Sequence, residues 1–65
     1  MSTFEKYTKE DVARGRAIEL SKQHTTKPFS VILNQGIYFV EDGKRSARSH
    51  ESLIGVFENG KQVIA

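Results

Sequence analysis

The stretch that decides the fold is residues 29–41, FSVILNQGIYFVE. Two runs rich in β-branched and aromatic residues flank Gln35-Gly36, a dipeptide suited to a two-residue turn. The pattern therefore predicts strands over 29–34 and 37–41, joined as an antiparallel hairpin.

The turn fixes the pairing of these strands, and the pairing fixes which side chains share a face. Leu33 is expected opposite Tyr38 and Val31 opposite Val40, all on one face. Residues 32 and 39, an isoleucine and a phenylalanine, are expected to pair on the other. An antiparallel sheet with one solvated face alternates apolar and polar residues, so this sheet is expected to bury or pair both faces.

Two further turn signals follow, Asp42-Gly43 and Asn59-Gly60, each suited to a type I′ turn. They predict three more strands, over residues 44–47, 53–58 and 61–65. A competing interpretation makes residues 50–57 a short helix. Gly55 is a poor helix residue and the pair that follows it favours a strand, so the strand is preferred.

Helical signals precede the hairpin. Thr8 is suited to an N-cap, and Asp11 to the positive end of a helix dipole. Three apolar residues then recur at helical spacing: Ala13, Ala17 and Leu20. Pro28 disfavours helical geometry at the residue before it. The sequence therefore predicts a helix over about residues 9–23.

Together these elements predict a single α+β domain over residues 1–65, with an N-terminal helix followed by a four- to five-stranded antiparallel meander. One helix can cover only one face of the sheet. The second apolar face is expected to close by curling into a small barrel, by packing on another copy, or by binding a different protein. The expected core is Phe29, Val31, Leu33, Tyr38 and Val40 with Ala13, Ala17 and Leu20.

Composition excludes several classes of protein. The 65 residues carry 10 Lys and Arg against 8 Asp and Glu, a formal net charge of +2, and no cysteine. Without cysteine there is neither a disulfide nor a thiolate metal site, and a reducing, cytoplasmic location is expected. No signal-peptide pattern and no apolar run of about 20 residues occurs, so no membrane association is expected.

No residue pattern points to catalysis. His24 and His50 have no partner at metal-ligand spacing, and the serines around His50 form no nucleophile motif. The five glycines form no phosphate-binding loop. We therefore expect no enzymatic activity, no cofactor and no metal.

Residues 44–50, KRSARSH, form the densest basic cluster. Arginine forks and serine hydroxyls suit phosphate oxygens. Lys44, Arg45 and Arg48 are thus candidate nucleic-acid contacts, and Arg14 and Arg16 extend the cluster if the helix packs beside it. The alternative interpretation is a polar connection between strands, because three phosphate contacts alone give weak binding.

Two functions are expected from these observations. The first is a non-catalytic interaction protein that binds a protein partner or a second copy through its second apolar face. Its candidate interface residues are Ile37, Phe39, Leu53, Phe57 and Ile64. The alternative is a weak nucleic-acid-binding module that uses the basic cluster.

Overall fold

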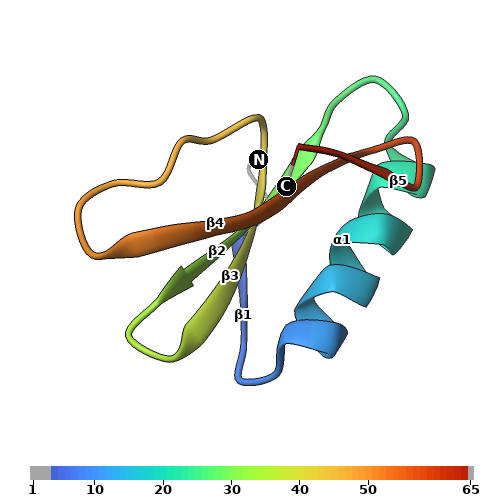
Figure 1. Cartoon of the computed structure of the whole chain (residues 1–65). Helices are drawn as coiled ribbons and strands as arrows, with labels where there is room; N and C mark the ends of the chain where they lie inside the picture. The colour runs from blue at the N-terminus through green and yellow to red at the C-terminus, as the bar shows by residue number, and fades with distance from the viewer. Residues whose placement is uncertain (1–3, 65) are drawn as a thin grey trace.

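The computed structural model describes residues 4–64 as one helix and five strands, and of Ile64 it describes the backbone alone. All strand pairs are antiparallel, and the helix packs against one face of the single sheet (Figure 1). The α+β class predicted from the sequence is confirmed. The elements in chain order are β1 (Phe4–Tyr7), α1 (Glu10–Gln23), β2 (Phe29–Asn34), β3 (Ile37–Asp42), β4 (Glu51–Glu58) and β5 (Lys61–Ile64).

The strand order is β1-β3-β2-β4-β5, so β1 and β5 are the two edges and the sheet is open instead of closed into a barrel. The order also departs from a meander, because β4 pairs with β2 and not with β3. The loop over residues 43–50 carries the chain from β3 to the other side of β2 (Figure 1).

One predicted strand is wrong, and one strand of the sheet was not predicted. Residues 44–47 belong to this loop, since Gly43, at φ +93°, binds the carbonyl of Pro28 through its N–H instead of turning a hairpin. The fifth strand is instead β1, which precedes the helix and pairs with β3 over all four of its residues.

The helix begins one residue later than its N-cap signal indicates. Lys9 occupies the N-cap with extended backbone angles and no side-chain cap, so the prediction of Thr8 as the cap is wrong. Asp11 accepts a 3.0 Å hydrogen bond from the N–H of Val12 instead. The helix ends at Gln23, as predicted from the proline that follows.

The core lies between α1 and the sheet. It is made of Ala13, Ala17 and Leu20 from the helix and Phe29, Val31, Val40 and Phe57 from the strands. The small alanines allow α1 to approach the sheet closely. Tyr38 packs against this core in part, and Leu33 is half-buried. The predicted hairpin register is confirmed, with Val31 opposite Val40.

A β-bulge in β4 moves Phe57 to the helix side. The partner of Val31 is Gly55, while the partner of the next residue of β2 is Leu53, so one residue of β4 is extra. Leu53 and Val56, three residues apart, consequently share a face, and Phe57 points to the core. Strict alternation along the strand places Phe57 on the same face as Leu53, and this prediction is therefore wrong.

Candidate functional site

The face of the sheet turned away from α1, the open face, carries the candidate site. Its membership follows from the strand register, because directly opposed residues point the same way. The described residues on it are Phe4, Lys6, Ser30, Ile32, Asn34, Ile37, Phe39, Glu41, Glu51, Leu53 and Val56. It is therefore an apolar surface bordered by charges.

The 43–50 loop is fastened to this face at Ser30, which is fully buried. The Ser30 hydroxyl donates a 2.6 Å hydrogen bond to the carbonyl of Gly43 and accepts one of 3.1 Å from the N–H of Arg45. A buried hydroxyl needs such partners, and these two hold the start of the loop against β2.

The Arg45 side chain then bridges two strands. Its guanidinium binds Glu41 of β3 at 2.6 Å and Glu51 of β4 at 2.8 Å, with β2 between them. Ile32 lies in the stretch of β2 that this bridge crosses, and it is fully buried although no helix covers this face. The loop and Arg45 thus close part of the open face, and the two carboxylates share one guanidinium, so this cluster of three side chains keeps one net negative charge.

Beside this bridge the open face is hollowed, with a cavity volume of about 460 Å³. One wall is aromatic: Phe4 of β1 and Phe39 of β3 have ring centroids 5.5 Å apart at a tilt of 32°. Phe4 remains 57% exposed. The residues that line the hollow are Phe4, Asn34, Phe39, Glu41, Arg45, Arg48 and Glu51.

The structure divides the predicted interface residues. Ile37, Phe39 and Leu53 share the open face, whereas Phe57 is buried against the helix. The side chain of Ile64 lies outside the described residues. Phe4 was missed because no hydrophobic pattern surrounds it; the single signal was an aromatic residue ahead of the helix.

The predicted basic residues do not form one surface. Arg14 and Arg16 belong to α1, on the other side of the sheet from Arg45. Arg14 lies near Glu10 and over the ring of Phe57, 5.9 Å from its centroid. The nucleic-acid contacts predicted on the helix are therefore separated from those in the loop.

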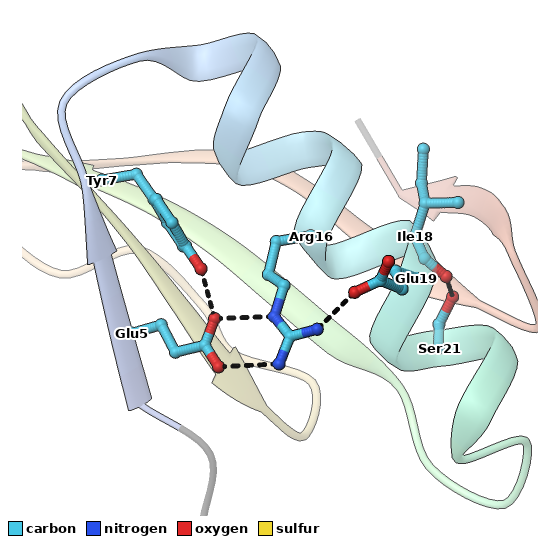
Figure 2. A network of polar contacts seen from close by, with 6 residues as sticks. All are labelled: Glu5, Tyr7, Arg16, Ile18, Glu19 and Ser21. Carbon is cyan, nitrogen blue, oxygen red and sulfur yellow. Dashed lines mark hydrogen bonds and ion pairs between the residues drawn. The ribbon is translucent and has the colours of Figure 1, made fainter.

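Arg16 is the centre of a polar network between α1 and β1. It donates two hydrogen bonds to Glu5, of 2.9 and 3.1 Å, and another to Glu19 (Figure 2). Tyr7 donates its hydroxyl hydrogen to the same Glu5 carboxylate. These bonds, that of Arg16 first, hold the pKa of Glu5 below its usual value, while the bond to Glu5 raises the pKa of Tyr7.

In the loop, Lys44 and Arg48 are exposed and form no ion pair with any residue in the range 4–64. Arg48 uses its backbone N–H, which donates a 3.0 Å hydrogen bond to Glu51, and its side chain borders the hollow. His50 ends the loop at φ +68° and is exposed.

Among the described residues, no group of three or more histidine or acidic side chains is placed to hold a metal ion. The one helix in the described part of the chain is too short and too polar to cross a membrane. Comparison with protein-family models, curated proteins and solved structures gave no match to this chain.

Proposed function

We propose that this protein is a non-catalytic binding module that takes another polypeptide on the open face of its sheet. The observation that carries the proposal is the exposed Phe4 ring, in contact with Phe39 beside a hollow of about 460 Å³. Aromatic side chains are enriched at protein interfaces, and an exposed apolar patch rimmed by polar groups is typical of them.

The charges around the hollow favour a polypeptide over a nucleic acid. The lining contains two carboxylates and two guanidinium groups, from Glu41, Glu51, Arg45 and Arg48. A phosphate chain would meet the two carboxylates there, whereas a polypeptide offers groups of both signs and apolar side chains for the rings.

The test is a selection of random peptides, displayed on phage, against the wild-type protein and two variants. Phe4→Ser removes the exposed ring at little cost to folding, because more than half of that side chain is exposed. Val12→Ser is the matched control, since Val12 is 47% exposed but lies on α1. Circular dichroism first establishes that both variants fold.

We expect peptides that bind the wild type and the Val12 variant and lose binding to the Phe4 variant. No enrichment, or enrichment that ignores Phe4, would contradict the proposed function.

The alternative of nucleic-acid binding is carried by Lys44 and Arg48, the two predicted loop contacts without an ion pair in residues 4–64. It requires salt-sensitive binding of a labelled single-stranded oligonucleotide that the double variant Lys44→Ala, Arg48→Ala abolishes. Absence of oligonucleotide binding at low salt would rule out this alternative.

A further inference from the structure

The two edges of the sheet are not equivalent. At one edge, β1 pairs with β3 over four residues without a shift in register. At the other, the pairing of β5 with β4 shifts between Val56 and Phe57, where the partners are Ile64 and Gln62. Val63 is therefore an extra residue in the edge strand. Such a bulge is a common device against the addition of another strand, and β1 has none.

We propose that the partner adds to the outer edge of β1 as an extended antiparallel strand, with an acidic residue opposite Lys6 and an apolar residue opposite Phe4. This inference rests on the proposed function and names the class of partner. In this mode of recognition, main-chain hydrogen bonds give affinity and alternate side chains give specificity.

The charges on β1 favour an acidic residue in the added strand. Glu5 faces α1, where Arg16 compensates its charge. Lys6 is on the open face opposite Phe39, is exposed, and has no ion pair with any residue of the described chain. The uncompensated charge of the edge is therefore positive. Opposite charges across a strand pair stabilise it, and like charges destabilise it.

The same charges argue against a second copy of β1 as the added strand. Two identical antiparallel edges meet about a twofold axis, so a residue lies opposite its own copy. The registers that pair three of the four residues, Phe4–Lys6 or Glu5–Tyr7, place Glu5 opposite Glu5 or Lys6 opposite Lys6. The first register sets together two carboxylates that Arg16 already binds, and it leaves Lys6 opposite Phe4 without a counter-charge. The second sets together two uncompensated Lys6 side chains. A foreign strand with an acidic residue opposite Lys6 is therefore favoured.

The edge is also held ready for binding. Figure 2 shows Glu5 and Tyr7 of β1 turned toward α1, where the two Arg16 hydrogen bonds and the Tyr7 bond converge on one carboxylate. These contacts fix β1 from its helix side and leave Phe4 and Lys6 on the other. A strand fixed before binding loses less conformational entropy when the partner arrives.

The probe is a capped synthetic peptide that repeats the unit threonine-aspartate-threonine-phenylalanine, titrated into the ¹⁵N-labelled protein by NMR. Opposite an antiparallel edge, only alternate residues of the added strand turn their N–H groups toward it. Two isomers are therefore compared, one N-methylated at the threonines and one at the aspartates and phenylalanines. We expect one isomer to lose binding and the other to retain it, with amide shifts in residues 4–7.

A charge swap tests the acidic position. Lys6→Glu should weaken binding of the aspartate peptide by roughly three- to tenfold and strengthen binding of the matching lysine peptide. Lys61→Glu, the same charge change on the opposite edge strand, should leave both affinities unchanged. No binding of the unmodified peptide, or no effect of Lys6→Glu, contradicts the inference.

The outcomes separate the two proposals. If both N-methylated isomers bind equally well and Phe4→Ser abolishes binding, edge pairing is wrong while the binding function of the open face stands. If binding ignores Phe4 as well, both proposals fail.

Discussion

The Ser21 hydroxyl accepts a 2.8 Å hydrogen bond from the backbone N–H of Gly60 and thereby ties the last turn of α1 to the turn between β4 and β5. Ser21 is fully buried and donates its own hydrogen to the carbonyl of Ile18, 2.8 Å away (Figure 2). The stem of Lys22 covers the same turn, so that a Cβ on Gly60 would lie 2.7 Å from its Cε.

Substitution of Gly60 should show whether the Lys22 stem restricts this turn. Gly60→Ala and Gly36→Ala both place alanine in the left-handed region, at φ +81° and +78°, which costs about 1 kcal/mol in each. Only Gly60 has a neighbour in the way, and because that neighbour is the exposed, flexible stem of Lys22, the variant should lose at most about 0.5 kcal/mol more of the free energy of unfolding. Urea denaturation measures both. In a Lys22→Ala background the difference should disappear; its persistence would show that the stem is not the cause.

Removal of Arg45 should destabilise the sheet. Arg45→Ala leaves Glu41 and Glu51 half-buried without their counter-charge, at an expected cost of about 2 kcal/mol in the free energy of unfolding. Arg48→Ala, in the same loop, should cost less than about 0.5 kcal/mol because its side chain has no ion pair within residues 4–64. Equal costs would contradict the bridging role of Arg45.

Acid should weaken the link between β1 and α1. The hydrogen bonds from Arg16 and Tyr7 lower the pKa of Glu5 in the folded state. The Glu5 carboxylate therefore stabilises the fold fully at pH values above the ordinary pKa of a glutamate, near 4.5. That contribution is lost as the pH falls through the folded-state pKa. Glu5→Gln should therefore cost about 0.5–1 kcal/mol at neutral pH, and the difference from the wild type should vanish in acid.

Thermal unfolding over a range of pH measures this difference. Glu58→Gln, the same change on an exposed residue of β4, is the control. A difference for Glu5→Gln that stays constant down to acid pH would contradict the assigned role.

Local signals predicted most of the elements because turn chemistry is local. Gln35 and Gly36, and Asn59 and Gly60, all take positive φ, as the two central residues of type I′ turns must. The register of the first hairpin followed from its turn. The strand Phe4–Tyr7 was missed because two of its four residues are charged, and it is extended because β3 offers it a partner.

The site could be predicted only in part. Phe39 and Leu53 were expected on the second apolar face, and the register places them there. The bridge by Arg45 could not be foreseen, because Glu41 and Glu51 approach each other only when β4 pairs with β2. The bulge beside Gly55 could not be located from alternation, since it breaks the alternation itself.

The central place of β2 in the sheet also bears on how the chain folds. The hairpin of β2 and β3 closes through a two-residue turn, whereas β1 pairs with β3 although α1 and β2 lie between them in the sequence. Closing a longer segment costs more entropy before its contacts form. We therefore expect the hairpin to form early and β1 to dock last, so mutations in β1 should speed unfolding and leave the refolding rate nearly unchanged.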